Sequence, residues 1–423
     1  MGAKVISVVC TLAQVPIALH ALGAEAYGLW ITLMSLTVML NFIDLGLGVG
    51  LQKTMAVAFG QDNQVQIRRI FFTGAIALGA FAIVALVVGL PLALLLDWGG
   101  MLKIQDAVLH DQARIGLAIT FAAFALGLPF NALPRLAAAT QRGWLQAGWI
   151  AVGSIVSLAM MALAAKARWG FLPLLALTTL TPTLQGFGLW LHLRHALGWK
   201  KAKLELLSRP ERRALAGESL LFSVPQLGLA LVQAAPPFVL SLAAGPIAAT
   251  AFNLLQRLFS PVTQGQILFL NPLWPAVTEA HVRGESAWVH RAFRQSLLVA
   301  LGCMLALGVL TQFSGPLLHA WIGGAAVLAP APLAWLTCAW FVTQVAWQPL
   351  MYLLVGVGEL SALAVWGLVG PGLSLVAMAV AVARHGSATA VLAGAVIGLA
   401  LGGLPGLAFA TARALRGSRA QSR

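Results

Sequence analysis

One face of a stretch in the second half of the chain carries an arginine among carboxamides and hydroxyls. Its members follow steps of four, three, four and seven residues, which places them on one side of a helix: Asn253, Arg257, Ser260, Gln264 and Asn271. Arg257 lies about eleven residues into an apolar stretch, roughly 16 Å at 1.5 Å per residue. A guanidinium at that depth needs a water-filled cavity or a partner, and it pairs with phosphate oxygens in a bidentate manner. The spacing therefore predicts a cavity that binds an anionic group.

A second polar face, in the first half of the chain, includes a carboxylate. Its members follow steps of four, three and four residues inside the apolar stretch 27–51: Thr37, Asn41, Asp44 and Gly48. A carboxylate inside a membrane span is costly unless it meets a partner or a water-filled cavity. Two roles for Asp44 stay open, namely ion coupling or pairing with a cavity cation, and capping of a helix that breaks before the glycines that follow.

Two further stretches carry polar residues at helical spacing. One holds Ser7, Thr11 and Gln14, and the other holds Ser219, Ser223, Gln226 and Gln233. Such groups either hydrogen-bond neighbouring helices together or line a cavity, and the spacing alone does not separate the two roles. The cavity interpretation assigns substrate binding to Arg257, Asn253, Gln264, Gln226, Gln233, Asn41 and Gln14.

Arg135 lies in the segment LPRLAAATQRGW, near the expected cytoplasmic end of the stretch 114–137. A long basic side chain at such a place can reach the membrane interface without a specific partner. The alternative is that Arg135 holds a phosphate at the inner mouth of the cavity.

The overall composition shows which kind of element positions these residues. The chain has 423 residues, of which 60% are hydrophobic and 9% are charged, and its mean hydropathy is +0.89. Continuous apolar runs of about 20 residues are typical of membrane-spanning helices. We expect an all-α polytopic membrane protein with about twelve spans, at roughly 4–20, 27–51, 69–95, 114–137, 146–166, 169–193, 216–243, 246–275, 295–319, 331–355, 360–383 and 387–412.

The spans divide into two groups of six around a basic segment. The predicted organisation is an N-terminal lobe 1–193, a cytoplasmic linker 194–215, a C-terminal lobe 216–412 and a basic tail 413–423. The linker is predicted to form a short amphipathic helix that lies on the surface of anionic lipid. A weak echo between IALHALGAEAYGLW and FVLSLAAGPIAATAF points to related halves, each with an apolar helix, a tight turn and a second helix.

The basic residues set the expected orientation. The net charge is +14, and Lys and Arg concentrate in the loops that lie on one side when the N-terminus is inside. Both termini are therefore expected in the cytoplasm, without a cleavable signal peptide, and nucleic acid is not an expected partner. Cys10, Cys303 and Cys338 lie in predicted spans without CxxC spacing, so neither a metal site nor a cofactor is expected.

Several of these segments resemble a known family. ALGAEAYGLWITLMSL followed by FIDLGLGVGLQK resembles the opening of bacterial polysaccharide-export flippases of the Wzx type, in which "LG", an acidic or small residue, "YG" and then "DLG" recur. LPRLAAATQRGW and AFNLLQRLFSPVTQ are similar to its corresponding segments. The chain departs from the family in having almost no basic segment before the first helix.

The resemblance implies a transporter of the multidrug/oligosaccharidyl-lipid/polysaccharide exporter superfamily. Its expected fold is MATE-like, with two six-helix lobes around a central cavity. The implied activity is alternating access in the bacterial inner membrane, which turns a polyprenyl-pyrophosphate-linked oligosaccharide from the inner to the outer leaflet for lipopolysaccharide or exopolysaccharide synthesis. Expected partners are this lipid-linked substrate, membrane lipids, and polysaccharide polymerase and assembly proteins, and the energy source is a proton, sodium or substrate gradient.

Three alternatives are set against this interpretation. A drug or cation exporter of the same superfamily would favour acidic residues in the cavity, where only Asp44 and Glu218 are available. A lipid II flippase has a similar architecture but usually two further helices. A polytopic polysaccharide-assembly enzyme would need a large outer loop with catalytic acids, and the longest outer loop, 96–113, has no DxD motif.

Overall fold

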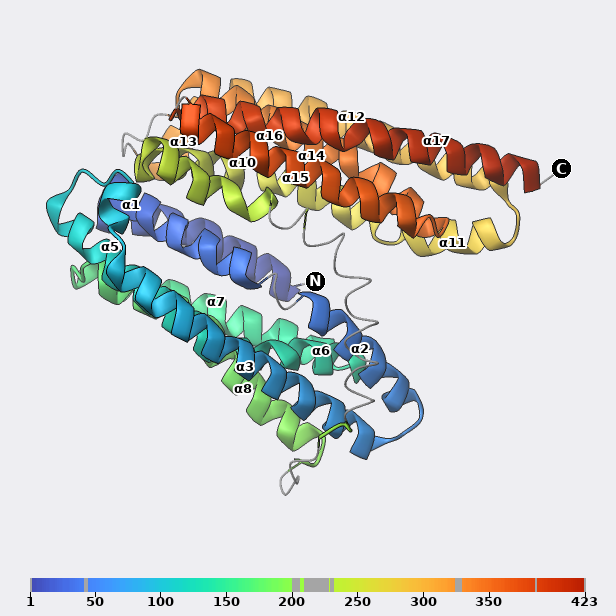
Figure 1. The fold of residues 1–423 in the computed structure, drawn as a ribbon, viewed down its shortest axis with the longest axis horizontal. Helices are drawn as coiled ribbons and strands as arrows, with labels where there is room; N and C mark the ends of the chain where they lie inside the picture. The colour runs from blue at the N-terminus through green and yellow to red at the C-terminus, as the bar shows by residue number, and fades with distance from the viewer. Residues whose placement is uncertain are drawn as a thin grey trace. The chain divides into compact units, whose positions relative to one another are not determined.

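The computed structural model describes residues 2–41, 45–199, 206–208, 228, 232–323, 329–384 and 386–421 (Figure 1). Contacts between residues divide the chain into two compact units, Met1–Val224 and Pro225–Arg423. We call them unit 1 and unit 2. Asp44, Glu218 and Gln226 lie outside the described residues, as does most of the predicted linker 194–215.

Unit 1 is built from helices that the hydrophobic runs predict. They are α1 (Gly2–Asn41), α2 (Leu45–Gly60), α3 (Gln64–Leu95), α4 (Trp98–Met101), α5 (Ala107–Gly127), the 3-10 turn η2 (Leu128–Asn131), α6 (Ala132–Ala139), α7 (Gly143–Lys166) and α8 (Phe171–Ala196). Their core gathers around Met55, Phe71 and Leu136, which are almost fully buried. The 3-10 turn lies where Pro129 interrupts the ladder of backbone hydrogen bonds between α5 and α6.

Unit 2 repeats this pattern. Its described helices are Val232–Ala244, α10 (Pro246–Leu270), α11 (Leu273–Val282), α12 (Ser286–Gln312), α13 (Ser314–Ile322), α14 (Ala331–Gly356), α15 (Leu360–Arg384), α16 (Ala388–Gly402) and α17 (Leu404–Gln421). α14 contacts most of the other helices, and its side chains Trp340, Val345 and Leu354 are almost fully buried. It is the central helix of this unit.

The number of membrane spans follows from these helices. Among the described residues, nine helices are long and apolar enough to cross a bilayer. One of them, α1, is 40 residues long, about 60 Å at 1.5 Å per residue, which is twice the hydrocarbon thickness of about 30 Å. Because Gly23 interrupts α1 with a non-helical backbone, α1 supplies two spans. The described residues thus give ten spans by length and composition; Val232–Ala244 is a shorter apolar helix and α10 is less apolar, so the expected number of twelve stays a prediction.

The same glycine turn occurs once in each unit. Gly23 has φ 80° and ψ 169°, and Gly245 has φ 83° and ψ 170°, a region that residues with a Cβ rarely adopt. The two glycines are 222 residues apart. The ends of α2 and α11, Gly60 and Val282, are also 222 residues apart. The faint sequence echo between the halves therefore falls on a glycine turn of the same backbone geometry in each unit.

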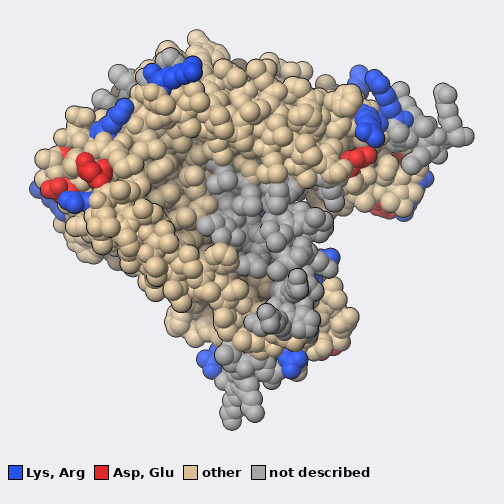
Figure 2. All heavy atoms as spheres, in the orientation of Figure 1, with Lys and Arg blue, Asp and Glu red and all other residues tan. Residues whose placement is uncertain are grey.

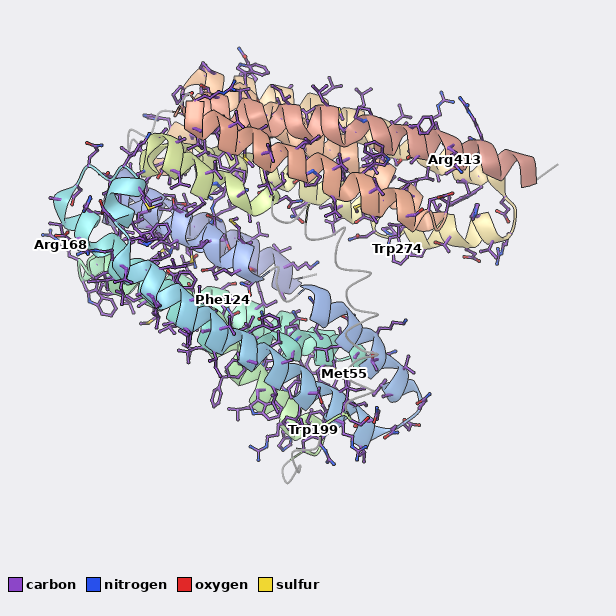
Figure 3. All side chains as sticks on the ribbon, in the orientation of Figure 1. Met55, Phe124, Arg168, Trp199, Trp274 and Arg413 are labelled. Atoms are coloured by element: carbon purple, nitrogen blue, oxygen red, sulfur yellow. The ribbon has the colours of Figure 1, made fainter. Side chains whose placement is uncertain are left out.

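On the face drawn in Figure 2, Lys, Arg, Asp and Glu gather near helix ends, with uncharged surface between them. Arg257, near the middle of α10, is an exception. In unit 1, Arg168 and Trp199 lie at opposite ends (Figure 3). In unit 2, Trp274 and Arg413 share one end (Figure 3). An uncharged central band is what a bilayer demands.

The described parts of the predicted linker pack on unit 1. The ring of Trp199 lies 5.7 Å from that of Phe71, measured between centroids. Leu207 is buried, and its backbone N–H donates to the Thr73 hydroxyl at 2.9 Å. The chain that leaves α8 is therefore held against α3 before it continues toward unit 2.

Helices α15 and α16 approach so closely that glycine is required between them. A Cβ placed on Gly398 would overlap the backbone of Ser374, and one on Gly394 would lie 2.8 Å from the carbonyl oxygen of Ala377. The hydroxyl of Ser374 donates to the carbonyl of Ala395 at 3.0 Å across the same contact. Small residues that allow backbones to touch are the usual basis of helix association in membranes.

We expect Gly398→Ala to separate α15 from α16 and to lower the stability of unit 2 by about 1–3 kcal/mol, the usual cost of overpacking. The measurement is the thermal midpoint of the purified protein in detergent. Gly372→Ala is the matched control, because Gly372 lies on α15 with open space where its Cβ would be. An equal midpoint for the two variants would contradict the close approach of these helices.

Candidate functional site

A polar pocket lies inside unit 2, between Val232–Ala244, α10 and α14. It encloses about 360 Å³. Its lining is dominated by carboxamides, with one guanidinium and two aromatic rings: Gln233, Asn253, Gln256, Arg257, Ser260, Thr263, Gln264, Ile267, Trp340, Phe341, Gln344 and Gln348. We call it the α10–α14 pocket.

Local sequence explains why α10 presents this face. The helix begins after Gly245, whose positive φ makes the turn, with Pro246 in the first turn where its missing N–H costs nothing. Polar residues recur along one side, and Phe252, Leu255 and Phe259 are buried on the other. Among the described helices of this length, α10 is not one of those apolar enough to cross a membrane unaided. It needs a polar environment on one side.

Arg257 is held in place by an amide relay. Its Nε donates to Oδ1 of Asn253 at 3.2 Å, and Nδ2 of Asn253 donates to Oε1 of Gln256 at 3.4 Å. Asn253 is buried, with 7% of its surface exposed. Within the described part of the chain, the terminal nitrogens of Arg257 make no hydrogen bond or ion pair. The relay therefore orients the guanidinium and leaves its outer edge free for a ligand.

Further donors and acceptors face the same space from α14. The amide of Gln233 donates to Oε1 of Gln344 at 3.3 Å, which links the first helix of the unit to α14. Trp340 is 2% exposed, and its indole N–H has no hydrogen-bond partner in the described structure; Oε1 of Gln348 is buried and likewise without a partner. Since buried polar groups are nearly always satisfied, a polar ligand or water is expected here.

The pocket has a definite charge character. Arg257 is the one charged residue among the described residues that line it, and no described carboxylate does. A cation would meet a guanidinium without compensation, whereas an anion or a polyhydroxylated group would meet donors from several sides. The pocket is therefore suited to an anionic or hydroxyl-rich ligand.

A second cavity lies inside unit 1, and we call it the unit 1 cavity. It encloses about 290 Å³, and its lining includes Asn41 of α1 together with residues of α5, η2, α6, α7 and α8. The amide of Asn131 donates to Oδ1 of Asn41 at 3.0 Å, and Asn41 in turn donates to the carbonyl of Thr37 at 3.0 Å. No charged residue is found among the described residues of this lining.

The residues predicted from spacing are distributed as follows. Gln233, Asn253, Arg257 and Gln264 come together in the α10–α14 pocket, while Asn41 lines the unit 1 cavity. Gln14 is half-buried on the first half of α1 and lines neither. Asp44 and Gln226 lie outside the described residues, so their predicted roles stay predictions.

Arg135 lies on α6 and is half-buried against α2. A Cβ on Gly48 would come within 2.7 Å of its Nε, so the missing side chain of Gly48 makes room for the guanidinium. In the described part of the chain Arg135 has no hydrogen bond or ion pair. Arg135 remains a candidate for binding an anion, which is one of the two roles that the sequence analysis left open.

The spacing argument did not identify three lining carboxamides and one indole: Gln256, Gln344, Gln348 and Trp340. Gln344 and Gln348 are four residues apart on α14, and Trp340 is four residues before Gln344. The same periodicity that singled out α10 was therefore present in α14. Because the rest of α14 is strongly apolar, this polar periodicity was not recognised from the sequence.

Comparisons with known proteins identify the fold. No family model and no curated protein matches the chain. A multidrug resistance MATE family transporter of the MOP superfamily, solved in an inward-facing conformation, is similar over 99% of this chain and 96% of its own, with 14% identity and a TM-score of 0.76. An outward-facing structure of a transporter so described has 15% identity over 99% of this chain and 96% of its own, with a TM-score of 0.56.

A third similar structure is a MOP superfamily transporter from Pyrococcus furiosus, described as having a binding pocket of reversed polarity that suggests a different function. It covers 100% of this chain and 97% of its own, with 13% identity and a TM-score of 0.58. At these identities the likeness establishes the fold alone. The chain is an all-helical, multi-pass membrane protein with the MATE-like fold.

We expect the α10–α14 pocket to contain water and the outer surface of α12 to face lipid. In a variant whose three native cysteines are replaced by alanine, Gln233→Cys or Gln264→Cys should react with a water-soluble maleimide. Leu305→Cys, at an exposed apolar position on α12, should react at least about tenfold more slowly, because the reactive thiolate requires a polar environment. Labelling is followed by mass spectrometry of the protein in native membranes. Equal rates at the three positions would contradict a hydrated pocket.

Proposed function

We propose that this protein is a transporter that flips a polyprenyl-pyrophosphate-linked oligosaccharide from the inner to the outer leaflet of the bacterial inner membrane. The observation that carries this proposal is Arg257, which is oriented by Asn253 inside a carboxamide-rich pocket without a described carboxylate. The substrate is expected to be a repeat unit of a lipopolysaccharide or an exopolysaccharide.

The chemistry of the pocket matches both parts of such a head group. The free edge of the guanidinium suits a pyrophosphate or the carboxylate of an acidic sugar, since these are planar or tetrahedral oxyanions that accept paired N–H bonds. Carboxamides offer a donor and an acceptor each, so Gln233, Gln264 and Gln344 are suited to sugar hydroxyls. The pocket is too polar for the hydrocarbon tail, which would stay in lipid.

The fold supports a transport cycle of alternating access. Proteins with this fold have been solved in inward-facing and outward-facing conformations. Such a cycle would expose the pocket first to the cytoplasmic side and then to the outer side, and Arg135 would meet the substrate phosphate at the inner mouth. Asp44 is the proposed site for proton or sodium coupling or for pairing with a cavity cation. Lipid and polysaccharide polymerase or assembly proteins are the proposed partners.

One observation bears on the main alternative, a multidrug exporter. The similar structures include transporters described as multidrug resistance proteins. An exporter of cationic drugs would need a carboxylate to compensate the charge of its substrate. Since the described lining of the α10–α14 pocket holds a cation instead, the comparison supports the fold and the pocket favours an anionic substrate.

The proposal predicts that Arg257→Ala abolishes most flipping. Loss of hydrogen bonds between charged groups costs about 1.5–3 kcal/mol, so we expect a roughly ten- to hundredfold slower rate. Arg257→Lys should retain part of the activity, because it keeps the charge and loses the bidentate geometry. The measurement is the leaflet distribution of lipid-linked oligosaccharide in a deletion strain complemented with each variant at equal membrane abundance.

Arg114→Ala is the control, because Arg114 is an exposed arginine outside the pocket. The deletion strain should accumulate a complete, inward-facing unit and lose its surface polysaccharide. Normal export with Arg257→Ala would remove the assigned role of Arg257. Accumulation of an outward-facing unit would point instead to an assembly enzyme, and unchanged lipid-linked sugars with lost drug resistance would favour the exporter.

A further inference from the structure

The unit 1 cavity corresponds in part to the place that the α10–α14 pocket has in unit 2. With the 222-residue offset of the glycine turns, Asn41 corresponds to Thr263, and both line their cavities. Helices α5 and α14 begin at Ala107 and Ala331, 224 residues apart, which pairs Thr120 with Gln344 in the same two linings. The two cavities therefore share positions on α1 and α10 and on α5 and α14, and the unit 1 cavity is lined in addition by α7 and α8.

The two cavities differ in charge. The α10–α14 pocket has Arg257, whereas the described lining of the unit 1 cavity is neutral throughout. Its polar groups are hydroxyls and carboxamides: Thr37, Asn41, Thr120, Asn131, Gln146, Thr178, Thr179, Thr183 and Gln185. A neutral cavity of this kind gives no electrostatic reason to select an anion or a cation. It selects by hydrogen bonds.

Some of these polar groups already have partners within the protein. Asn131 is bonded to Asn41, and the hydroxyl of Thr178 accepts from the indole of Trp30 at 3.0 Å. These contacts join α1 to η2 and to α8, so they stabilise the bundle and fix one wall of the cavity. Thr37, Thr120 and Thr179 donate to carbonyls of their own helices, so these lining groups are satisfied within the protein as well.

Three polar groups of the lining, on α7 and α8, make no hydrogen bond in the described structure. Gln146 on α7 and Gln185 on α8 are half-buried, and in the described structure neither side chain makes a hydrogen bond. The hydroxyl oxygen of Thr183, two residues before Gln185 on α8, is buried without a partner in the described structure as well. In a membrane protein such groups need water or a ligand, because lipid offers no compensation.

Aromatic rings complete the cavity. Trp149 lies in the lining and fills the space that a side chain on Gly188 would occupy, and Phe130 does the same at Gly186. Phe124 lies among the helices of unit 1 (Figure 3) and also lines the cavity. Ring faces beside carboxamides suit a molecule that has both an apolar face and a rim of hydroxyls.

We propose that the unit 1 cavity is a binding site for an uncharged pyranose. A sugar ring presents C–H groups to an aromatic face and paired hydroxyls to Gln146, Gln185 and Thr183. The volume of about 290 Å³ lies at the lower end of the range for ligand sites, which fits one or two rings and excludes a whole repeat unit. An oligosaccharide substrate of the proposed flippase would supply such a ring, but binding of a free sugar does not depend on flipping.

The test is photolabelling of the full-length protein in lipid nanodiscs with methyl pyranosides that carry a diazirine. We expect modification of α7 or α8 peptides, suppressed by excess unlabelled neutral pyranoside and far less by methyl glucuronide. Gln146→Ala, Gln185→Ala and Thr183→Val should each reduce labelling about fivefold, the effect of losing one neutral hydrogen bond. Gln61→Ala, at an exposed turn between α2 and α3, should leave it unchanged.

Two further outcomes separate this site from the proposed function. Arg257→Ala should abolish flipping and leave the labelling of α7 and α8 intact, because Arg257 lies in the other unit. Labelling confined to unit 2, or labelling that the three cavity variants do not change while they remain monodisperse, would overturn the sugar site. Competition by quaternary ammonium compounds in place of pyranosides would overturn the assignment of ligand class.

Discussion

The structure depends on the cost of placing a polar group in hydrocarbon. Backbone groups meet this requirement by forming helices, and polar side chains meet it only by turning inward. In α10 the requirement is most severe, because Arg257 stands near the middle of a 25-residue helix. The helix is therefore usable in a membrane only if its polar face borders an enclosed, wet space. The α10–α14 pocket borders this polar face, so the site and the placement of the helix depend on the same residues.

The repeat explains how one chain came to contain two such spaces. Gly23 and Gly245 adopt nearly the same backbone angles and reverse the chain at equivalent points. Each turn fixes where the following helix enters its unit. It therefore also fixes which face of that helix borders α5 in unit 1 or α14 in unit 2. Within that geometry the side chains of the two linings differ. Asn41 is part of a neutral lining in unit 1, and Arg257 gives the lining of unit 2 a positive charge.

Much of the fold can be predicted from the sequence, because apolar runs and helical spacing are local properties of the chain. The helical elements and the four lining residues Gln233, Asn253, Arg257 and Gln264 follow from them. Which helices pack against each other depends on tertiary structure and cannot be read from local sequence. Asn41 was grouped with Arg257 by residue type, but it lines a different cavity in a different unit. Gln344 and Trp340 were missed because polar residues at helical spacing on a mostly apolar helix resemble packing residues until the neighbouring helix is known.

The distribution of carboxylates limits the possible transport mechanisms. Of the twelve Asp and Glu residues in the sequence, only Asp44 and Glu218 fall within predicted spans. Asp97 and Asp106 cap helices with their side chains, and Glu285 lies at the N-terminal end of α12, where water reaches it. A cycle driven by protons or sodium through a carboxylate would therefore have to use one of those two residues. A cycle driven by the substrate gradient would need neither of them.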